Sequence, residues 1–135
     1  MNRREMIALT AAALTLPSLA HAAPEDYVPG LVEDHLKAGK TVFLDFKASW
    51  CTTCAAQERI LDKLKAENPK YEQFITFVNV DWDTYAKSTF TQGLKIPRRS
   101  TLVVLKGDAE LGRLVADTRE SAIRALLDLG LNASS

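Results

Sequence analysis

The chain has 135 residues, with 17 lysine and arginine residues against 17 aspartate and glutamate residues, and 47% of its residues are hydrophobic. Zero formal charge gives no electrostatic reason to bind nucleic acid or an anionic membrane surface. The length fits one domain, and two cysteines exclude a small fold held together by several disulfides. Cys51 and Cys54 are close neighbours in sequence, so a bond between them would restrict little chain entropy. We therefore expect any role of the two sulfurs to be in a reaction and not in stabilising the fold.

The first 22 residues have the pattern of an export signal. Two arginines near the start precede an apolar stretch, residues 6 to 16, which is too short to span a bilayer as a helix. Residues 20 to 22 (Ala-His-Ala) match the small-x-small pattern of a cleavage site. We therefore expect a signal peptide cleaved after Ala22, export to the bacterial periplasm by the general secretory or the twin-arginine route, and one domain over residues 23 to 135. An uncleaved N-terminal anchor is the alternative.

The first half of this domain alternates between helix and strand patterns. Residues 31 to 38 predict a short helix that is closed by Gly39. Residues 41 to 47 (TVFLDFK) form a nearly continuous apolar run, which is typical of a strand covered on both faces. Apolar residues then recur at helical spacing from residue 51 to 67, and the next run, residues 74 to 80, predicts a second buried strand.

The second half begins with a weaker helix pattern over residues 84 to 92, followed by an irregular stretch. Residues 101 to 106 and 110 to 116 flank a Gly-Asp turn and predict a hairpin. Asp117 is the expected N-cap of the last helix, and Gly130 is expected just past its end. This order of elements places the Cys-x-x-Cys motif between the first strand and the second helix.

Cys51 and Cys54 at the start of a helix fit the requirements of thiol–disulfide exchange. One thiolate must attack a disulfide, and a second thiol must resolve the mixed disulfide that forms. Unpaired N–H groups and the positive end of the helix dipole favour the thiolate of Cys51. We expect Cys51 to be the nucleophile and Cys54, one turn further along, to be the resolving thiol. A permanent structural disulfide and a metal site are the alternatives, although beyond the leader only His35 would be added to the two cysteines as a typical zinc ligand.

Residues 42 to 54 (VFLDFKASWCTTC) are similar to the active-site strand, Trp-Cys-x-x-Cys turn and helix start of the thioredoxin family. Residues 77 to 81 (FVNVD) resemble the central strand of that family, and residues 101 to 107 (TLVVLKG) resemble its late hairpin. With Glu58 after the second cysteine, the motif looks most like the C-terminal domain of thiol:disulfide interchange proteins of the DsbD type. The resemblance implies a thioredoxin-like α/β fold, with a central mixed sheet of about four strands flanked by helices in three layers.

Asp45 is the candidate for a proton relay. A carboxylic acid inside an apolar strand is costly to bury as a charge, so we expect its pKa to be raised and its proton to exchange with the thiol of Cys54. The resemblance agrees, since Asp45 falls at the position of the family's buried acid. Alternatively, Asp45 lies at a hydrated strand end and makes only hydrogen bonds. Trp50, Thr52 and Thr53 are expected to face the substrate beside the sulfurs.

The loop that should face the disulfide departs from the family pattern. The thioredoxin family places a cis-proline directly before the late strand, whereas here Pro97 is separated from that strand by an Arg-Arg-Ser segment. Counting back from the hairpin without a gap puts Ser100 in the proline position, and a three-residue insertion would leave Pro97 there. We expect Pro97, Arg99 and Ser100 to face the substrate, where arginine would favour a thiolate.

These features predict a periplasmic thiol:disulfide oxidoreductase that acts through the Cys51–Cys54 pair. The resemblance implies protein thiols and disulfides as substrates, an upstream redox partner protein, and no cofactor or metal besides the redox-active disulfide. We expect a monomer that meets a membrane only through its redox partner and binds no nucleic acid. A thiol-based copper chaperone and a non-catalytic binding module of the same fold are the alternatives. The Thr52-Thr53 pair favours neither an oxidant, a reductant nor an isomerase.

Overall fold

Five strands form a mixed sheet at the centre of the computed structural model, which describes residues 23 to 134. Their order in the sheet is β1-β3-β2-β4-β5. β1, β3 and β2 run parallel, whereas β4 runs antiparallel to both β2 and β5. The strands are β1 (Glu25–Asp26), β2 (Thr41–Lys47), β3 (Ile75–Asp81), β4 (Thr101–Lys106) and β5 (Ala109–Val115). The expected signal peptide, residues 1 to 22, lies outside the described residues.

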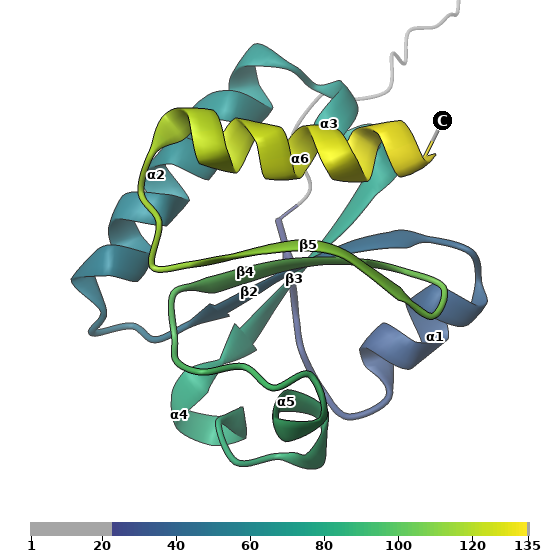
Figure 1. The fold of residues 1–135 in the computed structure, drawn as a ribbon, viewed down its shortest axis with the longest axis vertical. Coiled ribbons are helices and arrows are strands. Elements are labelled where there is room, and N and C mark those ends of the chain that lie inside the picture. Colours follow the sequence, from purple (N-terminus) through teal and green to yellow (C-terminus); the bar gives the residue numbers. More distant parts are fainter. Residues whose placement is uncertain (1–22, 135) are drawn as a thin grey trace, which may run out of the picture.

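Helices cover both faces of this sheet (Figure 1). One layer contains α2 (Thr52–Glu67), α3 (Lys70–Phe74) and α6 (Glu120–Ser134), and the other contains α1 (Leu31–Lys37), α4 (Trp82–Tyr85) and α5 (Thr89–Gly93). In Figure 1, α6 crosses above the sheet in yellow, and α1, α4 and α5 lie below it. The three-layer α/β architecture implied by the resemblance is confirmed, with one more strand than the four expected, because the lead-in segment adds the short β1.

The middle strand β2 is buried on both faces, as its apolar run predicts. Successive side chains point to opposite faces of a strand. Phe43 joins the core under α2, α3 and α6, whereas Val42, Leu44 and Phe46 join the core against α1, α4 and α5. Asp45 shares the face of Phe43 by the same alternation. The strand therefore carries a carboxyl group into the layer that holds the cysteine helix.

The last helix does not end where the sequence predicts. α6 continues through Gly130 to Ser134. A Cβ atom at residue 130 would lie 3.0 Å from Ile75 Cδ1 and 3.4 Å from Val104 Cγ1. The glycine therefore allows α6 to pack closely on the sheet and does not terminate the helix.

Residues 84 to 92, expected as one helix, instead form parts of two short helices, α4 and α5. Ser88 separates them, because its Oγ accepts the Thr91 N–H at 3.2 Å and caps the start of α5. A second difference precedes β3, where Phe74 ends the short helix α3 and the strand begins one residue later than expected. Pro69 is the N-cap of α3 and already has helical backbone angles, with its φ fixed by the proline ring. The apolar pattern did not reveal this helix.

Candidate active site

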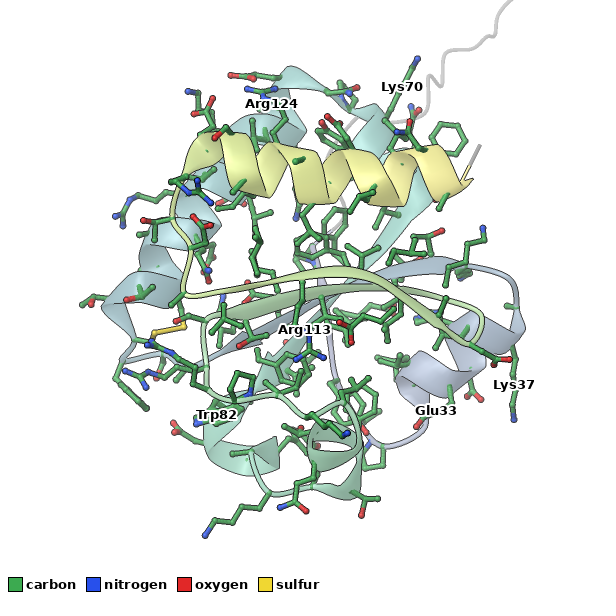
Figure 2. All side chains as sticks on the ribbon, viewed as in Figure 1. Glu33, Lys37, Lys70, Trp82, Arg113 and Arg124 are labelled. Carbon is green, nitrogen blue, oxygen red and sulfur yellow. A yellow bond between two sulfur atoms is a disulfide. The ribbon has the colours of Figure 1, made fainter. Side chains whose placement is uncertain are left out.

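The candidate active site lies at the edge of the sheet where the parallel strands β2 and β3 end. Lys47 at the end of β2 is paired with Asp81 at the end of β3. The antiparallel strand β4 begins beside them, with Thr101 paired to Phe46. Three segments therefore meet at this edge of the sheet: the chain between β2 and α2, the chain after β3, and the loop before β4. Figure 2 shows a disulfide, drawn as a yellow bond, at the N-terminal end of α2 in this region.

Cys51 and Cys54 form that disulfide, with their Cα atoms 5.3 Å apart. Cys51 is the N-cap of α2, and its Sγ accepts the Cys54 N–H at 3.1 Å. The exposed fractions are only 4% for Cys51 and 1% for Cys54. A cavity of about 330 Å³ lies beside both cysteines. The sulfurs therefore sit at a helix N-terminus and border a space that a reacting group can enter.

Ser100 lies directly against the two sulfurs. Its Oγ is 3.1 Å from Cys51 Sγ and 3.1 Å from Cys54 Sγ. The residue is 0% exposed and contacts the sulfurs themselves. Its expected role in facing the substrate stays a prediction. Pro97 is exposed, and no peptide bond among residues 23 to 134 is cis. Of the two residues considered for the position against the disulfide, the structure places Ser100 there.

Gln57 is a buried residue of α2 that the sequence analysis did not single out. Its Nε2 donates to the Ser100 carbonyl and to the Asp117 carbonyl, both at 3.1 Å. Its Oε1 has no hydrogen-bond partner. A signal was present, since Gln57 occupies the turn of α2 directly after Cys54, on the side of the helix that faces the core. Gln57 links the cysteine helix to the Ser100 loop and to the segment before α6.

Asp45 is 5% exposed, and its Oδ1 has no hydrogen-bond partner. Burial raises the pKa of this carboxyl from 3.8 to about 7; the nearby Lys47 ammonium opposes the rise and the Glu58 carboxylate adds to it. Asp45 lines a cavity of about 80 Å³ between the sheet and α2. The raised pKa agrees with the sequence-based expectation, and the burial argues against a hydrated strand end. The carboxyl can exchange a proton near neutral pH.

Lys47 and Glu58 form an ion pair between the Asp45 cavity and the cysteine cavity. Lys47 Nζ donates to Glu58 Oε1 at 2.6 Å. Both residues, together with Asn79, line both cavities. The pair therefore borders the space around the sulfurs on one side and the space around Asp45 on the other.

Trp50 is 56% exposed and precedes the first cysteine. Its Nε1–H donates to the Asp83 carboxylate, with both oxygens 3.0 Å away. The guanidinium of Arg99 lies over the Trp50 ring, 4.6 Å from the ring centroid. Thr52 is exposed and Thr53 is half-buried. The expected substrate-facing residues Trp50, Arg99 and Thr52 thus lie on or near the outer surface around the disulfide.

Trp82 is a further residue near the sulfurs. It packs against the group formed by Ala48, Cys51 and Cys54. Figure 2 labels Trp82 at the start of α4. Its position directly after β3 was the available signal, because the carboxyl ends of parallel strands lie at the same edge of a sheet.

Residues 23 to 134 bring together no three histidine, cysteine, aspartate or glutamate side chains that could hold a metal ion. Within the same residues, no helix has the length and apolar character needed to cross a membrane.

Comparison with known proteins agrees with this geometry. A family model described as Thioredoxin matches residues 30 to 128. A thioredoxin of Echinococcus granulosus is 30% identical over 96 residues, which cover 71% of this chain and 83% of that protein. A thioredoxin of Mycolicibacterium smegmatis is 29% identical over 96 residues, covering 70% and 83%. The crystal structure of Trxlp from Edwardsiella tarda EIB202 matches with a TM-score of 0.66 at 27% identity, covering 77% of this chain and 98% of that one.

A Cys-x-x-Cys disulfide at the start of a helix on this fold defines a thiol–disulfide oxidoreductase. The family match covers most of the chain, so the chain belongs to the thioredoxin family. Proteins of this family use protein thiols and disulfides as substrates. The comparisons do not confirm the narrower resemblance to interchange proteins of the DsbD type, which stays a prediction.

Proposed function

We propose that this protein is an exported thiol:disulfide oxidoreductase in which Cys51 attacks the disulfide of a protein partner and Cys54 resolves the mixed disulfide. The observation that carries the assignment is the placement of Cys51 Sγ at the N-cap of α2, within 3.1 Å of both the Cys54 N–H and the Ser100 hydroxyl. Both groups can donate to an anion at this sulfur. We therefore expect the pKa of the reduced Cys51 thiol to lie below its ordinary value.

The exchange has two steps. The Cys51 thiolate attacks one sulfur of the partner disulfide, and the other partner sulfur leaves as a thiolate. The Cys54 thiolate then attacks Cys51 Sγ, which forms the Cys51–Cys54 disulfide and releases the second partner sulfur. The partner gains two electrons and the enzyme loses them. Run backward, the same steps oxidise a partner dithiol, so the reduction potentials of the two proteins set the direction.

Asp45 is the proposed proton acceptor for Cys54. A buried carboxyl with a pKa of about 7 is present in both protonation states near neutral pH. Its cavity shares Lys47 and Glu58 with the cavity that the cysteines line, and water in these spaces would connect the groups. The carboxylate would take the Cys54 proton before resolution and return it to solvent afterwards.

The proposed location is the bacterial periplasm, with an upstream redox partner protein that restores the dithiol or the disulfide. Support for export comes from the pattern of residues 1 to 22. We propose that the domain acts as a monomer, that it meets a membrane only through its redox partner, and that it is similar to the C-terminal domain of interchange proteins of the DsbD type. N-terminal sequencing of the chain recovered after export tests cleavage after Ala22.

The test of the cysteine roles uses a small aromatic disulfide, 5,5′-dithiobis(2-nitrobenzoate), with single-cysteine variants of the whole protein. Cys54→Ser should form a stable mixed disulfide at Cys51, and the released thiolate reports its rate. Cys51→Ser, the matched control with the buried thiol, should react much more slowly. Equal rates for both variants would contradict the assigned roles. In the wild-type protein, the same adduct should be transient because Cys54 resolves it.

A further inference from the structure

The Ser100 hydroxyl is placed so that it can reach either reactive sulfur. Its oxygen lies 3.1 Å from Cys51 Sγ and 3.1 Å from Cys54 Sγ, and the residue is fully buried. Sulfurs in a disulfide carry no hydrogen, so the hydroxyl is the donor in this state. A hydroxyl carries one hydrogen that rotates to suit its surroundings. Ser100 can therefore donate to one sulfur or the other while its oxygen stays where it is.

Hydrogen bonds to three other segments of the chain hold Ser100 in this position. Its N–H donates to the Phe46 carbonyl at 2.7 Å, which ties it to β2. Its carbonyl accepts the Ala116 N–H at 2.8 Å and the Gln57 Nε2 at 3.1 Å. Ser100 has a φ of 64°, a left-handed conformation that few non-glycine residues adopt. The N–H and C=O groups of Ser100 are thus both hydrogen-bonded within the protein, and its side-chain hydroxyl contacts the two sulfurs.

Gln57 connects this loop to a second segment. The same Nε2 that donates to Ser100 also donates to the Asp117 carbonyl at 3.1 Å, before the start of α6. Because Gln57 lies on α2 one turn after Cys54, it fixes the distance between the cysteine helix and the Ser100 loop. Loss of this amide would remove the hydrogen bond that joins the Ser100 carbonyl to α2.

The geometry points to Ser100 as a catalytic hydrogen-bond donor to the thiolates of this site, with Gln57 as the residue that positions it. The inference rests on the proposed roles of Cys51 and Cys54. In the reduced enzyme, the hydroxyl donates to the Cys51 thiolate beside the Cys54 N–H. In the mixed disulfide, it turns to the Cys54 thiolate.

The attack of Cys54 on the mixed disulfide needs no reactant besides the two cysteines and the partner. The electron pair of the Cys54 thiolate forms the bond to Cys51 Sγ, and the bond between Cys51 and the partner sulfur breaks. Its electron pair leaves on the partner as a thiolate. Ser100 keeps its proton throughout, since it only donates a hydrogen bond.

This donor also affects the balance between dithiol and disulfide. A charge-assisted hydrogen bond is stronger than a neutral one, so the Ser100 hydroxyl stabilises a thiolate more than a disulfide sulfur. Thiolates occur only in the reduced form. Ser100 therefore favours the reduced form and makes the pair a stronger oxidant than it would be without the hydroxyl.

The test measures the titration of Cys51 in a Cys54→Ser background, where it is the chain's one remaining thiol. The rate of alkylation by iodoacetamide against pH reports its apparent pKa. Ser100→Ala and Ser100→Gly both remove the hydroxyl, but only glycine also relieves the positive φ. Both variants should raise the apparent pKa by about one unit, because a hydrogen bond to a charged group is lost. Ser88→Ala, which removes the hydroxyl that caps α5, is the matched control and should leave the titration unchanged.

The charged groups around the sulfurs stay the same in these variants. Those lining the cavity beside the cysteines are Asp26, Lys47, Glu58 and Asp81, with buried Asp45 behind the Lys47–Glu58 pair and Arg99 over Trp50. A rise in the apparent pKa with alanine alone would assign the effect to backbone conformation and contradict the inference. An unchanged titration in both variants would contradict it as well.

Failure of this inference can be told apart from failure of the proposed function. If Cys54→Ser still forms the mixed disulfide at Cys51 while the Ser100 variants titrate like the parent, only the role of Ser100 is wrong. If no mixed disulfide forms at Cys51, the proposed function itself is wrong. In two-cysteine proteins, Ser100→Gly should also make the reduction potential more negative.

The positioning role of Gln57 has its own readout. Gln57→Met keeps the length of the side chain and removes both donated hydrogen bonds. It should raise the apparent pKa of Cys51 in the same direction as Ser100→Gly but by less. Combined with Ser100→Gly, it should add no further rise. A loss of stability with no change in the titration would make Gln57 a purely structural residue.

Discussion

The two sides of the disulfide are built in different ways. On one side, Asp45 and Lys47 belong to a regular strand whose pairing with β3 and β4 fixes their positions. On the other side, Arg99 and Ser100 belong to a loop outside any helix or strand, held by hydrogen bonds to β2, α2 and the chain after β5. The strand side supplies charge near the sulfurs, and the loop side supplies a hydroxyl donor. Charge and hydrogen bonding at one reactive pair can therefore be changed separately.

The largest expected effect comes from Asp45→Asn on the strand side. The folded protein keeps the Asp45 proton up to about pH 7, whereas the unfolded chain loses it near pH 3.8. The free energy of unfolding of the wild type therefore falls as pH rises through this range. A difference of about three pKa units corresponds to about 4 kcal/mol. Urea denaturation should show Asp45→Asn more stable than wild type by up to about this amount above pH 7, with the difference disappearing as the pH falls below the unfolded pKa of 3.8.

Asp108→Asn, at an exposed turn, is the matched control for the loss of one carboxylate. A stability difference for Asp45→Asn that does not change with pH would show that Asp45 is not a buried acid of raised pKa. The same variant should also slow the resolution of the mixed disulfide while leaving its formation at Cys51 largely intact.

A smaller effect on the strand side comes from the Lys47–Glu58 pair. The Lys47 ammonium lowers the pKa of Asp45 and the Glu58 carboxylate raises it, although burial is the larger cause. Lys47→Met should therefore move the Asp45 titration to higher pH, and Glu58→Gln should move it to lower pH. Carboxyl carbon NMR shifts against pH measure both. Movement in the same direction would mean that the pair acts on Asp45 through structure and not through charge.

The smallest effect is expected on the loop side, from the contact between Arg99 and the Trp50 ring. Contacts of this kind contribute about 0.5–1 kcal/mol at exposed sites. A double-mutant cycle of Arg99→Ala and Trp50→Ala, followed by urea denaturation, should give a coupling energy in that range. Asp83→Asn weakens the other contact of the same ring and provides a comparison. Additive effects of Arg99→Ala and Trp50→Ala would show that the two side chains do not interact in solution.

The strand side was largely predictable from the sequence, because its information is local. The apolar run of residues 41 to 47 gives β2 with the bounds the structure shows, and the alternation along it places Asp45. Cys51 and Cys54 follow at the start of a helix, as the motif predicts. The cost of burying a carboxylate then gives the direction of the Asp45 pKa shift.

The loop side was not predictable in the same way, since its conformation depends on distant partners. Two alignments put either Ser100 or Pro97 against the disulfide, and only the bonds of Ser100 to Phe46 and Gln57 decide between them. The position of Gln57 one turn after Cys54 indicates a place near the site, but a single amide has no characteristic spacing that would reveal its partners Ser100 and Asp117. The prediction that Gly130 lies just past the end of the last helix was wrong for a related reason. The glycine is needed where α6 packs closely on the sheet, and the sequence pattern does not reveal that contact.

The reduction potential of the Cys51–Cys54 pair distinguishes a redox-active disulfide from a structural one. Equilibration of the purified protein with glutathione or dithiothreitol buffers of known potential, followed by alkylation of free thiols, measures it. We expect a reversible couple between about −270 mV and about −120 mV, the values for thioredoxin and for the strong oxidant DsbA. A potential below about −300 mV, which is typical of structural disulfides, would contradict a role in thiol–disulfide exchange.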